Sequence, residues 1–114
     1  MTEKDKVTAA TMAVLKSHAL AFKGGVERIL EDYAEDAIIM SPSGIHRGHD
    51  QIRPFFANEI VSFPEGFWQA LKTLKLQADG EYAYFLWQAK PWHDIGCDTF
   101  VVRNNKIVFQ SSTI

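Results

Sequence analysis

The sequence predicts an α+β domain in which three helices from the first half of the chain pack on a strongly curved, mostly antiparallel sheet. Two observations support this: helical periodicity dominates the first half, and extended runs joined by short turns dominate the second. The chain has 114 residues, close to the commonest size of one domain. We therefore expect a single domain over residues 1–114.

The first two predicted helices follow each other closely. Positions on one face of the first recur at steps of three or four residues, namely Val7, Thr11, Leu15, His18 and Phe22. Gly24-Gly25 ends this helix. The same spacing marks a shorter second helix, at Val26, Ile29, Leu30 and Tyr33.

A small hairpin and a third helix complete the first half. The run 37–40 ends at the turn-forming segment 41–44, and residues 45–48 continue beyond it. The third helix is marked by Ile52, Phe55, Phe56 and Ile60. His49 or Asp50 could cap it, with Pro54 inside its first turns.

The second half is predicted to form the long strands. Residues 74–78 alternate up to a turn at Asp79-Gly80, and residues 82–89 are aromatic on both faces. After a loop at 90–96, the strand that carries Asp98 turns at Asn104-Asn105, because asparagine tolerates positive φ. Residues 106–112 close the sheet.

Composition excludes several classes of partner. The net charge of −2 and pI near 6.0 provide no basic surface for nucleic acid or an anionic membrane. Cys97 is the lone cysteine, which fits a reducing compartment, and residues 1–6 lack a signal-peptide core, so we expect a cytoplasmic protein without a membrane span. No cofactor is expected.

Metal binding is not expected either. The candidate oxygen and nitrogen ligands are His46, His49, Asp50, His93 and Asp94. Their spacing does not require the side chains to converge, and solvated loop positions explain them equally well.

Asp98 is the most informative residue. It lies in Cys97-Asp98-Thr99-Phe100-Val101-Val102, a run typical of a packed strand. An unpaired carboxylate there would be costly, so its pKa should be perturbed. The alternative is a structural carboxylate paired with Arg103, Arg47 or a loop amide.

Five short segments resemble landmarks of the NTF2-like superfamily, in its SnoaL-like and ketosteroid-isomerase-like branch. They are Tyr33-Ala34-Glu35-Asp36-Ala37, Pro42-x-Gly44, Gly48-His49-Asp50-Gln51-Ile52, Asp98-Thr99-Phe100 and Lys106-Ile107-Val108. The resemblance implies a cone of helices over the curved sheet, an apolar pocket and a homodimer formed through the sheet. It does not imply one reaction.

The resemblance also assigns roles to individual positions. In ketosteroid isomerases an aspartate base moves a proton while a tyrosine and a protonated aspartate stabilise the oxyanion. Asp98 matches the protonated aspartate, and Ser41 occupies the position of the base. The tyrosine position falls at His18, or at Ser17 after a one-residue shift, and the helical face favours His18.

We therefore predict a proton-transfer centre made of Asp98 and His18. The residues expected around the ligand are Ser41, Tyr33, Met40, Phe55, Phe56, Trp87, Trp92 and Phe100. The ligand would be a small, apolar, cyclic molecule, and the reaction an isomerisation, cyclisation or dehydration.

Two other functions remain open from the sequence. Since Ser41 cannot act as the family's base, the chain could be a non-catalytic ligand-binding or dimerising module. A third interpretation is an interaction domain with an exposed sheet face. Strands that are apolar on both faces need cover on both, which predicts a homodimer.

Overall fold

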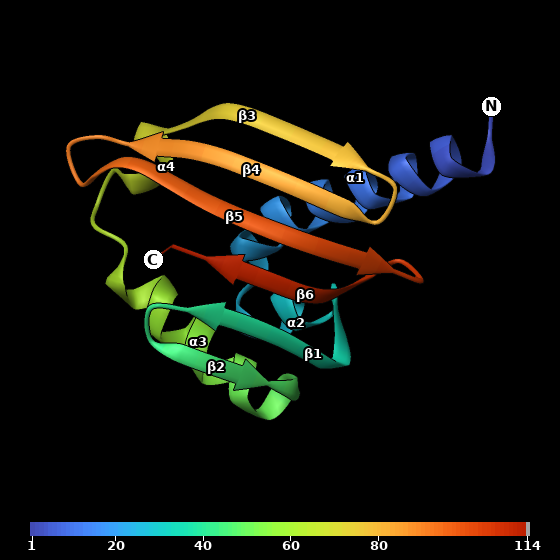
Figure 1. The fold of residues 1–114 in the computed structure, drawn as a ribbon. Helices are drawn as coiled ribbons and strands as arrows, with labels where there is room; N and C mark the ends of the chain where they lie inside the picture. The colour runs from blue at the N-terminus through green and yellow to red at the C-terminus, as the bar shows by residue number, and fades with distance from the viewer. Residues whose placement is uncertain (114) are drawn as a thin grey trace.

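A computed structural model describes residues 1–113 as one sheet with helices over one of its faces (Figure 1). The helical elements are α1 (Glu3–Ala21), the 3₁₀ turn η1 (Phe22–Gly24), α2 (Val26–Leu30), α3 (Gly48–Ser62) and α4 (Phe67–Ala70). The strands are β1 (Tyr33–Ser41), β2 (Gly44–Arg47), β3 (Leu71–Asp79), β4 (Tyr82–Ala89), β5 (His93–Arg103) and β6 (Lys106–Ser112). The predicted α+β class is confirmed.

The six strands are ordered β2-β1-β6-β5-β4-β3. Every neighbouring pair is antiparallel except β1 and β6, which run parallel. Register shifts interrupt β1–β6, β3–β4, β4–β5 and β5–β6. Such irregularities bend strands and increase their twist, which fits the observed curvature of the sheet.

The turns between the long strands have the conformations that their residues favour. Asn104 and Asn105 have φ of 54° and 62° between β5 and β6, and Gly80 has φ of 60° between β3 and β4. Both predicted turns are confirmed. The predicted strands over 82–89 and 106–112 agree with β4 and β6.

Helix α1 begins four residues earlier than the periodicity indicated, because Thr2 and Asp5 form a capping box. Thr11 and His18 of the predicted face are buried, whereas Val7 is 37% exposed. The Thr11 hydroxyl donates to the Gly80 carbonyl at 2.7 Å, and the Gly80 N–H donates to the Thr8 hydroxyl at 2.8 Å. These bonds attach α1 to the β3–β4 turn.

Helix α3 begins at Gly48, so neither His49 nor Asp50 caps it and that expectation is wrong. Arg47 is the N-cap residue, and its backbone N–H donates to the Gln51 side chain at 2.7 Å. Pro54 lies inside the helix, as predicted.

Two further predictions needed correction. Strand β5 begins at His93, so the loop predicted over 90–96 is shorter. The short helix α4 was not predicted, because its four residues are too few to show a period.

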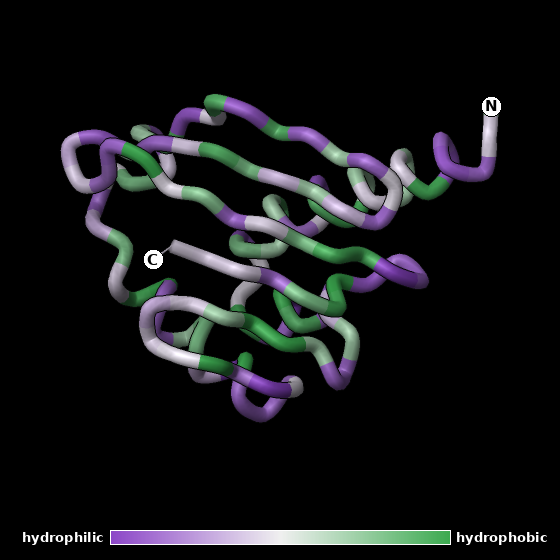
Figure 2. The backbone as a smooth tube through the Cα atoms, viewed as in Figure 1, coloured by the Kyte–Doolittle hydropathy of each residue, from purple (hydrophilic) through white to green (hydrophobic). Residues whose placement is uncertain are grey.

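Two hydrophobic clusters lie between the helices and the sheet. The larger lies between α1, α2, α3 and the sheet and includes Ile29, Ile39, Phe56 and Ile107. The smaller consists of Phe67, Trp87 and Ala89, with Phe63, Ala70, Leu71 and Phe85 against it. Figure 2 shows hydrophilic and hydrophobic residues mixed along β3. No helix of the described part has the length and apolar character that crossing a bilayer requires.

Candidate functional site

A cavity of about 600 Å³ lies between the helices and the inner face of the sheet. Helices α1, α3 and α4 form one wall, and β3, β4, β5 and β6 form the other. Its aromatic lining consists of Phe22, Phe56, Phe63, Phe67, Trp68, Phe85, Trp87 and Phe100. Four residues with ionisable side chains also line it, namely Lys16, His18, Glu59 and Asp98. The size and the apolar lining are those of a small-molecule site.

Asp98 lies on the sheet wall of this cavity. Its neighbours across the strands are Phe85 of β4 and Ser112 of β6. The Gln110 side-chain N–H donates to Asp98 Oδ2 at 3.4 Å, while Asp98 Oδ1 is buried without a hydrogen-bond partner among the described residues. One carboxyl oxygen is therefore left for another group.

Burial raises the pKa of Asp98 to about 6 because desolvation disfavours the carboxylate. Hydrogen bonding from Ser112, Trp87 and Gln110 opposes this rise. The predicted perturbation is present. Arg103, one of the suggested structural partners, instead binds Glu81 with two bonds of 3.0 Å.

A polar chain continues from Asp98 into the core. Gln110 is 3% exposed, and its side-chain oxygen accepts a hydrogen bond from the Tyr33 hydroxyl. Burial raises the pKa of Tyr33 well above its ordinary value, so this hydroxyl stays protonated and donates. Tyr33 thus reaches Asp98 through Gln110 and does not itself line the cavity.

His18 lines the same cavity from α1. Its ring packs edge-on against Phe22, Tyr33, Phe56 and Phe100, at centroid distances of 5.2 to 6.1 Å. Burial lowers its pKa to about 4, so the imidazole is neutral at pH 7. Its Nδ1 atom is buried without a partner within residues 1–113.

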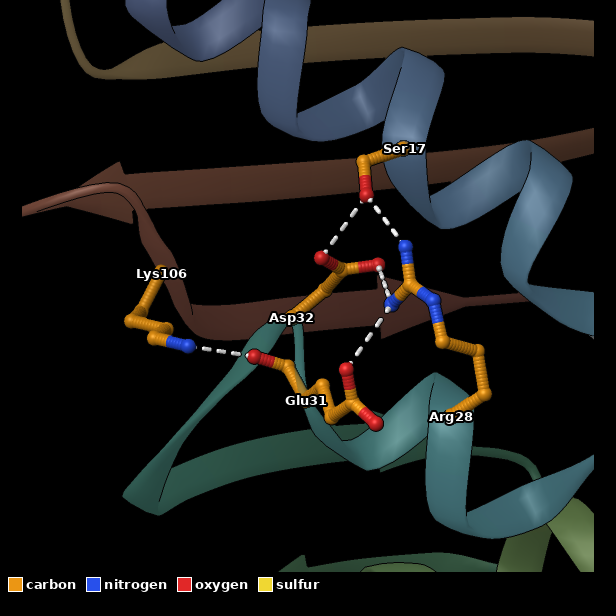
Figure 3. Close-up of polar contacts among 5 residues, drawn as sticks. All are labelled: Ser17, Arg28, Glu31, Asp32 and Lys106. Atoms are coloured by element: carbon orange, nitrogen blue, oxygen red, sulfur yellow. Dashed lines mark hydrogen bonds and ion pairs between the residues drawn. The ribbon is translucent and has the colours of Figure 1, made fainter.

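His18 and Asp98 line one cavity but are not bonded to each other. Within residues 1–113, no hydrogen bond or ion pair joins the two side chains. Ser17, the neighbouring candidate, lies elsewhere: its hydroxyl donates to Asp32 at 2.9 Å and accepts from Arg28 at 2.8 Å (Figure 3). Of these two residues of α1, His18 is the one that lines the cavity.

Glu59 is one of the cavity residues that the sequence analysis missed, as are Lys16 and Gln110. It lies in the last turn of α3, where the negative end of the helix dipole disfavours a carboxylate. Burial, and then the charge of Asp98, raise the pKa of Glu59 to about 8. A usable signal existed, because Ile52, Phe56, Glu59 and Phe63 follow one helical stripe.

The predicted ligand-contacting residues divide into two groups. Phe56, Trp87 and Phe100 line the cavity. Of the others, Met40 and Trp92 are 42% and 43% exposed, and Ser41 binds the Ser43 hydroxyl at 2.8 Å. Ser41, Met40 and Trp92 lie outside the lining of the cavity that holds Asp98.

A second cavity of about 520 Å³ adjoins the first. Phe55, predicted to contact the ligand, lines this one. Its polar lining residues are Ser43, His46, Asn58, Ser62 and His93, and Glu59 lines both cavities.

The suggested metal ligands do not converge. His46 contacts Ser43 at 3.0 Å, whereas His49 contacts the Tyr33 carbonyl at 2.9 Å. The His93 ring packs against Trp87, with centroids 5.6 Å apart. No group of three or more His, Cys, Asp or Glu side chains in the described part is arranged to hold a metal ion.

Gly96 positions one wall of the cavity. It faces Trp87 across β4 and β5, and a Cβ atom there would overlap the indole ring. The missing side chain lets the indole lie against the strand, close enough to Asp98 to affect its pKa.

Comparison with solved structures shows the same fold in other proteins. A de novo designed protein with a curved β-sheet matches with a TM-score of 0.72 and 17% identity, covering 100% of this chain and 88% of that one. A SnoaL-like protein of unknown function from Burkholderia thailandensis has a TM-score of 0.71 and 16% identity, over 91% of this chain and 92% of the other. TerC, co-crystallised with polyporic acid, has a TM-score of 0.69 and 12% identity, over 92% and 91%.

These likenesses show the fold alone, since a protein designed for its curved sheet is among them. No curated protein matches the sequence. A model of the SnoaL-like domain matches residues 14–110, which is well over half of the chain. This protein therefore belongs to the SnoaL-like domain family, within the NTF2-like superfamily.

Proposed function

We propose that this protein binds a small, largely apolar, cyclic molecule in the Asp98 cavity and moves a proton on it. The observation that carries the proposal is the buried, unpartnered Oδ1 of Asp98, a residue that lines a largely apolar cavity. Buried polar atoms usually have partners, so an unpartnered carboxyl oxygen on a residue that lines an apolar cavity is suited to a ligand.

The lining supports the class of ligand. Aromatic side chains on both walls favour a ligand with a flat ring system. Such a ring can stack on these side chains or pack against them edge to face. The few polar groups favour a ligand with one or two oxygens. TerC, which shares the fold, was crystallised with polyporic acid, and this agrees with a small-molecule role for the present chain.

Asp98 is suited to proton transfer because its pKa of about 6 lies near neutral pH. Its Oδ1 can take a proton from a carbon next to a carbonyl while Oδ2 stays bonded to Gln110. The neutral His18 can orient a ligand oxygen or proton donor through Nδ1. An isomerase, cyclase or dehydratase could each begin with this step.

2-Tetralone, a bicyclic ketone with exchangeable protons beside its carbonyl, tests the proposal. Its binding is followed by tryptophan fluorescence, since Trp68 and Trp87 line the cavity. Exchange in D₂O is followed by ¹H NMR. We expect saturable binding, and proton exchange that is faster than in buffer alone. Asp98→Asn should reduce the exchange rate at least about 100-fold.

The matched control is Asp94→Asn, an exposed position on the same strand outside the cavity lining. Exchange by Asp98→Asn at the wild-type rate would contradict the role of Asp98. Absence of both binding and exchange in the wild type would contradict the proposed function for cyclic ketones.

A non-catalytic binding module is the second candidate. It is favoured by Ser41, which occupies the position of the family's base and lies outside the cavity lining. This function predicts that 2-tetralone binds with no exchange above buffer. The same two measurements therefore distinguish the candidates.

We also propose that the chain forms a homodimer through the outer face of the sheet. Met40, Ile45, Tyr82 and Tyr84 are exposed on strands there. Covering them would remove apolar surface from water. Sedimentation showing a stable monomer at micromolar concentration would contradict the dimer.

A further inference from the structure

Two carboxyl groups, Asp98 on β5 and Glu59 on α3, line opposite walls of the same cavity. Each is half-buried, and the charge of Asp98 acts on Glu59. Within residues 1–113, no hydrogen bond or ion pair engages the Glu59 carboxyl. No side chain of the described residues therefore accounts for a carboxyl group at this position.

We propose that Asp98 and Glu59 act as a pair across the cavity, Asp98 as the base and Glu59 as the acid of the proposed proton transfer. This inference rests on the proposed function and names its second catalytic residue. It adds a second carboxyl to the predicted centre of Asp98 and His18, whose imidazole packs among aromatic rings in the same cavity.

The surroundings decide which carboxyl is the acid. Asp98 has donors around it, from Gln110, Ser112 and Trp87, and donors favour the ionised form. Glu59 has no such donors and lies at the negative end of α3, which favours the protonated form. Two carboxyls whose environments separate their pKa values in this way can take opposite roles.

The reaction step balances without a further reactant. Asp98 Oδ1 takes a proton from the carbon next to the ligand carbonyl, the C–H electron pair forms the C=C bond of an enol, and Glu59 protonates the carbonyl oxygen. The reverse step returns the proton to carbon at the same or another position. The two carboxyls together keep one negative charge throughout, so the apolar cavity never has to hold a second one.

The other titratable groups around the pair are few. Lys16 and His18 of α1 line the first cavity, and His46 of β2 and His93 of β5 line the second. Glu59 itself lines both cavities.

Carboxyl ¹³C NMR of the full chain tests the pair without any ligand. The expected result is two separate titration steps in the wild type, with the Glu59 step at lower pH in Asp98→Asn than in the wild type. A Glu59 step that Asp98→Asn leaves unmoved would overturn the pair.

Exchange of 2-tetralone tests the catalytic role. Glu59→Gln should slow exchange at least about 100-fold while changing the dissociation constant little. The exposed Glu65→Gln should leave both the exchange rate and the dissociation constant unchanged. If Asp98→Asn loses exchange and Glu59→Gln keeps it, the role of Glu59 fails and the proposed function stands. If the wild type shows no exchange, the proposed function fails, and with it the catalytic role of Glu59, while the titration still decides the pair.

Discussion

Two groups of buried or half-buried polar side chains on the helical side of the sheet are built in opposite ways. In the Ser17–Arg28–Asp32 cluster, both oxygens of Asp32 have partners, at 2.9 Å from Ser17 and 3.2 Å from Arg28 (Figure 3). In the cavity, Asp98 Oδ1 and His18 Nδ1 have none within the described residues. A satisfied network holds segments together, whereas unpartnered buried groups cost stability and remain available to a ligand.

The first way to test this contrast is Asp32→Ala. The Asp32 side chain is 13% exposed, and its loss removes a charged acceptor from both Ser17 and Arg28. We expect a loss of about 2–3 kcal/mol in the free energy of unfolding, measured with urea. Asp98→Asn should lose less, because one Asp98 oxygen makes no bond that could be broken. The contrast is wrong if Asp98→Asn destabilises more than Asp32→Ala.

Gly96→Ala changes the cavity without touching its ionisable groups. The new Cβ atom would push the Trp87 ring away from β5, at a cost of about 2 kcal/mol by overpacking. The displaced indole should also oppose the rise of the Asp98 pKa less, so that the pKa moves higher. Urea unfolding and carboxyl ¹³C NMR measure the two effects. An unchanged free energy of unfolding would contradict the expected overpacking against Trp87.

The pH dependence of stability should reveal Glu59. Between its ordinary pKa of 4.5 and about 8, the folded chain keeps a proton that the unfolded chain releases. Stability therefore falls as the pH rises through this window, and Glu59→Gln should regain about 2 kcal/mol at pH 6.5 relative to pH 5. The control is Glu65→Gln, at an exposed position. Parallel pH curves for wild type and Glu59→Gln would contradict this prediction.

His18 should produce the smallest effect, with the opposite sign. Its pKa is about 4 in the folded chain and 6.5 ordinarily, so the unfolded chain binds more protons between these values. This part of the stability is present at pH 7 and is lost as the pH falls toward 4. His18→Leu should remove about 1 kcal/mol of that loss at pH 5, measured by urea unfolding. A greater loss at pH 5 in the variant than in the wild type would contradict the neutral imidazole.

What the sequence could predict was set by local chemistry. The turns at Gly80 and at Asn104-Asn105 follow from residues that accept positive φ, and Asp98 was conspicuous because its neighbours favour a packed strand. The parallel pairing of β1 with β6 joins residues far apart in the chain, and no local pattern encodes it. Glu59 was missed because most charged helix residues face solvent, and only its place on the Phe56–Phe63 stripe marks it.

The parallel pairing of β1 with β6 also bears on how the protein folds. In the described sheet, β6 lies between β1–β2 on one side and β3–β4–β5 on the other, although it is last in the sequence. It also carries Gln110 and Ser112, which surround the Asp98 carboxyl. During synthesis the two halves of the sheet cannot be joined until β6 has been made, and such long-range strand pairing is slow to form. The site and the sheet should therefore be completed in one late folding step.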